Sequence, residues 1–146
     1  MALARLVSLS QRNMGSMSEN LERISQDPKQ VSALLEMIFR LFEIWHLDAH
    51  QQAILLGVSS TSTIYRWRKH KVKRLRIETL ERVAHLLAIH KLLRLHFNRN
   101  PDLGRNWVRT PNKASCFRGK PPIDIMLRGK VSDFELVWRY LEYAAG

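Results

Sequence analysis

The fold is decided by the stretch Ala49-His50-Gln51-Gln52-Ala53-Ile54-Leu55-Leu56-Gly57-Val58-Ser59, followed three residues later by Thr63-Ile64-Tyr65-Arg66-Trp67-Arg68. Asp48, directly before it, can cap a helix, and Gly57 most easily adopts the left-handed conformation that ends one. The small side chain of Ala53 permits a second helix to approach closely, while Val58 and Ile64 can pack into the angle between two helices. These features predict a helix-turn-helix.

Further helices are predicted on both sides of this motif. Apolar residues recur at steps of three and four from Val31 to Trp45 and from Ile77 to Phe97, which is typical of amphipathic helices. The inner face of the second of these is expected to comprise Leu80, Val83, Ala84, Leu87, Leu92 and Leu95. The other predicted helices comprise residues 48–56, about 59–70, 122–127 and 132–144. No stretch has the alternating period of a strand, so the chain is predicted to be all-α.

The chain is strongly basic. Its 146 residues include 24 Lys and Arg against 13 Asp and Glu, for a net charge of +11 and a pI near 10.5. Such a protein attracts phosphate backbones or acidic protein surfaces. Cations can also serve solubility alone, but seven of the eleven residues from Arg66 to Arg76 are Lys or Arg and none is acidic. This clustering favours a nucleic-acid partner, because phosphates relieve the repulsion between crowded like charges.

The motif and the basic run together predict a site for DNA. The second helix of the motif would lie in the major groove, where hydroxyl side chains reach phosphates and base edges and guanidinium groups reach guanine. The candidate DNA-binding residues are Ser59, Ser60, Thr61, Ser62, Thr63, Arg66, Arg68, Lys69, Lys71, Lys73 and Arg74. The span from Gly57 to Ile64 is one residue longer than the motif usually allows, so we expect the second helix to begin late or to dock at an altered angle. The alternative is a structural unit of three helices with a solvated basic loop.

Composition divides the chain into three parts. Residues 1–27 are polar and mixed in charge, and are expected to form a flexible N-terminal arm with at most one short helix. Prolines and glycines collect between Asn98 and Pro121, which predicts turns and loops there. We therefore expect a helix-turn-helix DNA-binding domain over residues 28–97 and a second small helical domain over residues 98–146.

Little in the sequence points to catalysis, a cofactor or a metal. Cys116 is a lone cysteine, so no intramolecular disulfide or Cys-x-x-Cys pair can form. His46 and His50 could share a helix face, but no third metal ligand follows at a suitable spacing. We expect no enzyme activity, no cofactor and no metal site, and no motif for a phosphate loop or a catalytic nucleophile argues otherwise. The apolar start is interrupted by charged and polar residues and no run is long enough to span a membrane, which predicts a cytoplasmic protein.

Two groups of residues resemble the Xre/MbcA/ParS-type antitoxins. The first combines Gln52-Ala53-Ile54-Leu55-Leu56-Gly57-Val58-Ser59 and Tyr65-Arg66-Trp67 with Leu80-Glu81-Arg82-Val83-Ala84-His85-Leu86-Leu87-Ala88-Ile89. The second combines Trp107-Val108-Arg109-Thr110-Pro111-Asn112 with Phe117-Arg118-Gly119-Lys120-Pro121-Pro122-Ile123-Asp124 and the closing helix. This second group is similar to the toxin-binding domain of that family and is the more specific of the two. The chain departs from the family pattern at Arg118, Lys120 and Met126.

The resemblance implies an antitoxin of a type II toxin-antitoxin system with an Xre-like helix-turn-helix. Its partner would be a toxin of the RES fold, which consumes or transfers ADP-ribose from NAD. The antitoxin would hold this toxin inactive by blocking the toxin's cleft. The resemblance also implies repression of the shared operon at operator DNA, by a homodimer within a toxin-antitoxin hetero-oligomer. The candidate toxin-binding residues are Arg109, Asn112, Arg118, Lys120, Glu135, Arg139, Tyr140, Glu142 and Tyr143. Their arginines and tyrosines have the chemistry of interface hot spots and are expected to be exposed.

Alternatives stay open. A stand-alone helix-turn-helix repressor would explain the basic motif without a toxin. A hydrolase or transferase that uses Cys116 or the histidines would belong to another functional class. Trp107, Phe117 and Trp138 can also be read as a second small core rather than a binding surface, and we expect this of Trp107 and Trp138.

Overall fold

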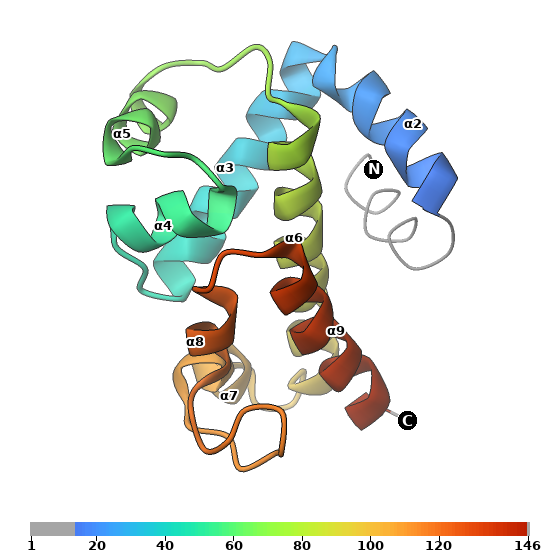
Figure 1. Ribbon diagram of the computed structural model, residues 1–146, viewed down its shortest axis with the longest axis vertical. Coiled ribbons are helices and arrows are strands. Elements are labelled where there is room, and N and C mark those ends of the chain that lie inside the picture. The colour runs from blue at the N-terminus through green and yellow to red at the C-terminus, as the bar shows by residue number, and fades with distance from the viewer. Residues whose placement is uncertain (1–13, 146) are drawn as a thin grey trace.

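A computed structural model describes residues 14–145, and within that range the chain forms helices and no strand (Figure 1). In chain order the elements are α2 (Met14–Ser25), α3 (Pro28–Ile44), α4 (Ala49–Leu56), α5 (Thr61–Lys69), α6 (Ile77–His96), α7 (Pro101–Asn106), the 3-10 turn η1 (Trp107–Arg109), α8 (Pro122–Met126) and α9 (Val131–Ala145). The all-α prediction is confirmed, and each of the predicted helices is present.

Local sequence signals begin and end several of these helices. The carboxylate of Asp27 accepts a backbone N–H of the first turn of α3 at 3.1 Å, and Pro28 occupies the first helical position. Asp48 and Gln51 form a reciprocal capping box at the start of α4, with hydrogen bonds of 2.8 and 3.0 Å. The helix ends at Gly57, as predicted, with φ of 70°. The boundaries of the helix-turn-helix are therefore local properties of the sequence.

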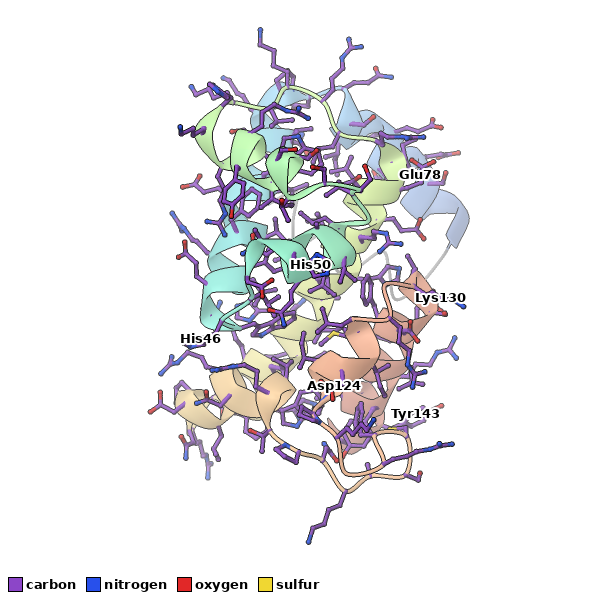
Figure 2. All side chains as sticks on the ribbon, turned by 60° about the vertical axis from the view of Figure 1, so that its left-hand side comes forward. His46, His50, Glu78, Asp124, Lys130 and Tyr143 are labelled. Atoms are coloured by element: carbon purple, nitrogen blue, oxygen red, sulfur yellow. The ribbon has the colours of Figure 1, made fainter. Side chains whose placement is uncertain are left out.

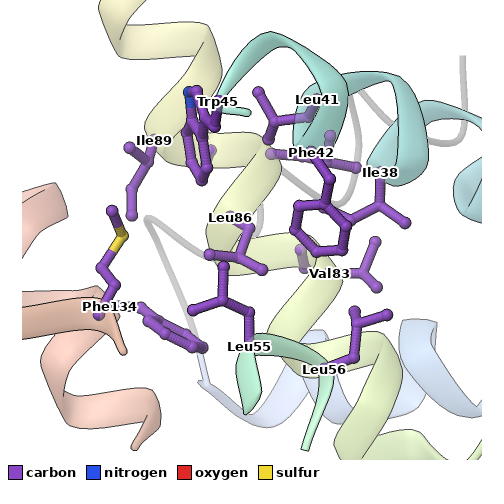
Figure 3. Close-up of a cluster of buried hydrophobic side chains, with 14 of the residues drawn as sticks. Ile38, Leu41, Phe42, Trp45, Leu55, Leu56, Val83, Leu86, Ile89 and Phe134 are labelled. Carbon is purple, nitrogen blue, oxygen red and sulfur yellow. The ribbon is translucent and has the colours of Figure 1, made fainter. Parts of the chain in front are cut away.

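One hydrophobic core surrounds α6, the central helix. α2, α3, α4, α7 and α9 all contact α6. Among the side chains buried together are Phe42 and Trp45 from the end of α3, Leu55 from α4, Leu86 from α6 and Phe134 from α9 (Figure 3). Complete burial of a side chain of this kind contributes about 1.5 to 3 kcal/mol. Because residues from both predicted domains enter this core, the two domains are packed together rather than strung along a linker.

Two expectations about local structure are wrong. The stretch from 98 to 121 is not all turn and loop, because α7 and η1 lie within it. Pro101 begins α7, and Gly104 is buried against α6, where a Cβ would lie 3.1 Å from the Cβ of Phe97. Leu95, expected on the inner face of α6, is 62% exposed. Leu93 is buried instead, because it continues the i, i+4 spacing of the core face of α6.

α2 is the short helix expected within the N-terminal arm. Its Leu21 and Ile24 are buried, and the helix contacts α3 and α6. Two apolar residues three positions apart lie on one face of a helix, which explains why this part of the predicted arm is packed on the core. The rest of the predicted arm, residues 1–13, lies outside the described residues.

Candidate functional site

The turn between α4 and α5 depends on a glycine and an arginine. Gly57 has φ of 70°, and its N–H donates to the carbonyl oxygen of Ile54 at 3.2 Å. Arg82 reaches across from α6 and donates to the carbonyl oxygens of Ile54 and Leu55 at 3.4 and 3.3 Å. A Cβ at position 57 would lie 2.6 Å from the Nε of Arg82. The turn therefore requires glycine both for its backbone angle and for the space that Arg82 occupies.

α5 presents its amino-terminal end as a place for an anion. It begins at Thr61, in keeping with the late start expected from the long spacing after Gly57. Ser60 caps the helix by accepting the N–H of Ser62 at 3.1 Å, and Ile64 is fully buried and anchors it. The first turn of a helix carries free N–H groups and a partial positive charge, both of which suit a phosphate.

The hydroxyl residues predicted to reach DNA surround this helix start. Ser59 and Ser62 are exposed, while Ser60, Thr61 and Thr63 are half-buried. In Figure 1, α5 lies at the outer edge of the molecule, with α4 between it and the C-terminal helices. Tyr65 is 60% exposed on the same helix. Tyr65 was not among the predicted DNA-binding residues. Its place beside Arg66, on a helix with few other apolar residues, was a signal that could have identified it.

A basic surface follows α5 along the linker of residues 70–76. Leu75 is buried and Val72 is half-buried against the core, so the linker is tethered at two points while the cations between them stay exposed. Five of the predicted DNA-binding cations are exposed and take part in no ion pair within the described part of the chain: Arg66, Lys69, Lys71, Lys73 and Arg74. These five residues are called the basic surface below.

Arg68, also predicted to contact DNA, is engaged within the protein. Its guanidinium donates to Gln52 Oε1 at 3.0 Å and to Glu43 Oε1 at 3.4 Å. It also lies 4.5 Å from the centroid of the Phe39 ring, a cation–π contact. Gln52 is itself buried and donates to the carbonyl oxygen of Leu47 at 2.8 Å. Arg68 therefore holds α5 against α3 and α4.

A second ordered feature lies in the C-terminal part of the chain, where three aromatic rings pack together. The ring centroids of Trp107 and Tyr140 are 6.0 Å apart in a stacked arrangement, and Phe117 packs edge-on against them at 5.9 and 5.0 Å. Phe117 is buried and the other two residues are half-buried. This aromatic cluster joins the loop of residues 110–121 to the last helix, α9. Phe117 belongs to the one hydrophobic core, and Trp107 and Trp138 pack against that core, so the second small core expected for Trp107 and Trp138 does not form as a separate unit.

The loop over this cluster is closed by backbone hydrogen bonds. The N–H of Asn112 donates to the carbonyl oxygen of Lys120 at 3.2 Å, and the N–H of Gly119 donates to that of Asn112 at 2.9 Å. The side chain of Asn112 accepts the N–H of Ala114 at 3.0 Å, which adds a further tie at the start of the loop. Arg118 has a positive φ of 53°, a conformation unusual for a residue other than glycine. The loop therefore presents a fixed, strained tip.

The candidate toxin-binding residues fall into two groups. The exposed group comprises Arg118 and Lys120 in the loop and Arg139, Glu142 and Tyr143 on α9, of which Tyr143 is 84% exposed. The half-buried group comprises Arg109, Asn112, Glu135 and Tyr140. Because the aromatic cluster brings the end of α9 beside the loop, the exposed residues of both segments gather at one end of the molecule (Figures 1 and 2).

Two residues expected to be exposed are not. Tyr140 packs in the aromatic cluster because the helical period of α9 turns it toward Phe117. Arg109 has a buried Nε without a hydrogen-bond partner, and its other guanidinium nitrogen donates to Asn106 Oδ1 at 2.7 Å. Tyr140 therefore packs beneath the loop, and Arg109 is hydrogen-bonded to α7. Leu136 on α9 is exposed, and an apolar residue one turn before Tyr140 was an available signal for it.

One histidine of α6 contacts α9, and another is buried within α6. The Nε2 of His96 lies 2.7 Å from the carbonyl oxygen of Leu141. His85 is buried, with its Nε2 4.0 Å from Glu81 Oε1. Burial lowers the pKa of His85, and the nearby carboxylates of Glu135 and Glu81 oppose that effect only in part. The contact of His96 with Leu141 had no signal in the sequence, because its partner lies on a helix 45 residues away.

Three residues were discounted for metal or thiol chemistry: His46, His50 and Cys116. Within the described part of the chain, no group of three His, Cys, Asp or Glu side chains could hold a metal ion. His46 and His50 are both exposed, and Cys116 is half-buried with its thiol free. No helix between residues 14 and 145 has the length and apolar character to cross a membrane.

Comparison with known proteins agrees with both halves of this arrangement. The family model described as the antitoxin Xre-like helix-turn-helix domain matches residues 22–88, and that of the antitoxin Xre/MbcA/ParS C-terminal toxin-binding domain matches residues 92–146. An uncharacterized protein of Sinorhizobium fredii, y4oB, is 38% identical over 122 residues, which cover 84% of this chain and 92% of that protein. The chain belongs to the Xre/MbcA/ParS family of antitoxins, with a helix-turn-helix domain and a toxin-binding domain.

Proposed function

We propose that this antitoxin neutralises a RES-type toxin, which consumes or transfers ADP-ribose from NAD, and represses its own operon through the helix-turn-helix. The observation that carries the proposal is the presence of two unlike surfaces on one core. The basic surface and α5 lie at one side of α6, while the loop of residues 110–121 and the end of α9 lie at the other end (Figure 1). One chain can therefore hold DNA and a toxin at the same time.

In the DNA complex, α5 enters the major groove with its amino-terminal turn toward the bases. The hydroxyl groups of Ser59 and Ser62 and the free N–H groups of the first turn face phosphates or base edges. The basic surface then follows the sugar-phosphate backbone. Arg68 keeps α5 at its angle to α4, so it acts on DNA through the position of the helix.

In the toxin complex, the end of α9 and the loop tip form the contact. A toxin that handles NAD must bind a pyrophosphate dianion, so its cleft is lined with cationic groups. The carboxylate of Glu142 can pair with such cations, and the ring of Tyr143 can occupy the space of a nicotinamide or adenine ring. Both side chains are exposed on the last helix. Tyr140 supports this surface by holding the loop rather than by entering the cleft.

We further propose that the antitoxin works in the cytoplasm as a homodimer within a toxin-antitoxin hetero-oligomer. A dimer would place two α5 helices on two half-sites of an operator, which is how helix-turn-helix proteins read symmetric DNA. The chain itself supplies binding rather than catalysis.

The experiment that tests this proposal is co-expression with the neighbouring gene, with growth and NAD level as readouts. The neighbouring product alone should stop growth and lower NAD, and the antitoxin should restore both. Restored growth after Cys116→Ala excludes a catalytic role for the thiol. Operator binding without any toxic neighbour would instead favour a stand-alone repressor.

A further inference from the structure

The turn between α8 and α9, residues 127–130, packs on the last turn of α4. A Cβ at Gly129 would lie 3.2 Å from the Cγ2 of Ile54 and 3.6 Å from its carbonyl oxygen. The turn is closed by the N–H of Arg128, which donates to Ile125, and that of Gly129, which donates to Met126, each at 3.0 Å. Gly129 has φ of 84°, so this close seat requires glycine. A segment of the toxin-binding domain is thus fixed against the helix-turn-helix.

Two cations flank this glycine. Arg128 and Lys130 are exposed, and neither takes part in an ion pair among residues 18–144. Two carboxylates lie near them in sequence. Asp133 is buried and accepts the backbone N–H of Lys130 at 3.3 Å, where it caps α9. Asp124 is exposed on α8, one helical turn before Arg128, and forms no ion pair. The two cationic groups therefore remain available to an outside partner.

Their position relates them to DNA rather than to the toxin. Ile54, on which Gly129 sits, is three residues before Gly57, the turn that leads to Ser59 and α5. Figure 2 places Lys130 at the start of α9, at the side of α4, while Tyr143 lies at the other end of the same helix. B-DNA carries one negative charge per about 1.7 Å of its axis, so cations beside a bound reading helix have phosphates within reach.

We infer that Arg128 and Lys130 form a second phosphate-binding site, supplied by the toxin-binding domain, next to the helix-turn-helix. The inference rests on the proposed DNA binding and adds to it a contact outside the helix-turn-helix domain. DNA and toxin are then held at the two ends of α9. The amino-terminal end of this helix adds its partial positive charge to the same site.

The test compares Arg128→Gln/Lys130→Gln with wild-type protein in binding to the DNA upstream of the operon across a salt series. Each lost phosphate contact flattens the slope of log affinity against log salt by about 0.9, so the double variant should lose about 2 units of slope. Gly129 is retained, which leaves the seat on Ile54 intact. The matched control is Lys91→Gln/Arg99→Gln, which removes one exposed cation from the C-terminal half of α6 and one from the turn that follows it, and should keep the wild-type slope.

The outcomes separate the two claims. Equal slopes for the double variant and the wild type overturn this inference and leave the helix-turn-helix contact standing. An equal decrease in the slope of log affinity against log salt in both double variants shows a general effect of charge and also overturns the inference. Wild-type protein that binds no DNA removes both this inference and the proposed repression. The Arg128→Gln/Lys130→Gln variant should keep its helical content and its toxin neutralisation. If it does, misfolding is not the cause of a weaker salt dependence of DNA binding.

Discussion

Arg82 donates a hydrogen bond of 3.3 Å to the carbonyl oxygen of Leu55, so a side chain of α6 caps the carboxyl end of α4. The same guanidinium lies 5.8 Å from the centroid of the Phe134 ring on α9. Arg82, a residue of the central helix, thus contacts both the helix-turn-helix and the last helix. Helix ends carry unpaired carbonyl groups, and Arg82 satisfies two of them where glycine leaves the helix.

Arg82→Ala is expected to lower the free energy of unfolding by about 1 to 3 kcal/mol, because it removes charge-assisted hydrogen bonds to partly buried carbonyls. Urea unfolding followed by circular dichroism measures this loss. Arg94→Ala, an exposed arginine on the same helix, is the control and should change stability by less than about 0.5 kcal/mol. Equal effects of the two substitutions would mean that the cap contributes nothing.

Gly57→Ala is expected to destabilise the protein more than Gly119→Ala. Both glycines have positive φ, at 70° and 80°, so both variants incur the cost of a left-handed alanine, about 1 to 2 kcal/mol. At position 119 no atom lies within 4 Å of the new Cβ, whereas at position 57 it meets Arg82 at 2.6 Å. The difference between the two thermal midpoints therefore reports the displacement of Arg82. A larger loss at position 119 would contradict the packing described here.

The basic surface predicts a salt-dependent complex with operator DNA. If its five cations each touch a phosphate, the slope of log affinity against log salt should be about −4 to −5 from this surface alone. Alanine at Lys71, Lys73 or Arg74 should flatten the slope by about 0.9 each without loss of stability. Arg68→Ala should lower the thermal midpoint instead, because it releases α5 from Gln52. A complex insensitive to salt would rule out this surface as the DNA contact.

Deletion of Glu142–Gly146 is expected to release toxin activity while it spares DNA binding. The shortened chain ends at Leu141, whose carbonyl oxygen contacts His96. The contact between α6 and α9 therefore remains, and so does Tyr140 in the aromatic cluster. NAD turnover by the purified complex, with and without the tail, measures the release. Full silencing by the truncated protein would place inhibition in the loop of residues 110–121. In that case Arg118→Ala and Lys120→Ala should release the toxin.

Stability is expected to fall as the pH drops below about 6.5, the ordinary pKa of histidine. Burial lowers the pKa of His85 in the folded protein, so below that pH the unfolded chain binds the proton more readily. His85 is therefore neutral and favourable above pH 6.5, and its contribution is lost toward acid. His85→Gln should make the thermal midpoint depend less on pH between 7 and 5. An unchanged pH profile in this variant would show that the titration of His85 does not matter for folding.

Features that depend on neighbours along the chain were predicted well. The cap at Asp48 and the stop at Gly57 each act within one helical turn. The basic run was also visible, since like charges close in sequence must lie close in space. The side-chain hydrogen bond of Asn112 is of the same local kind, because its partner is two residues away.

Features that depend on a partner far along the chain were decided by the tertiary structure. Arg68 was predicted only as a DNA contact, whereas in the fold its guanidinium also reaches Glu43, which lies 25 residues away. Tyr140 reads as exposed, but Phe117 packs beneath it. By itself the sequence determined the helices outside residues 98–121 and the excess positive charge, because backbone propensity, capping and charge act over a few residues. The assignment of each arginine and tyrosine to the core or to the surface required the packing of distant helices, since a side chain binds the partners that the fold brings within its reach.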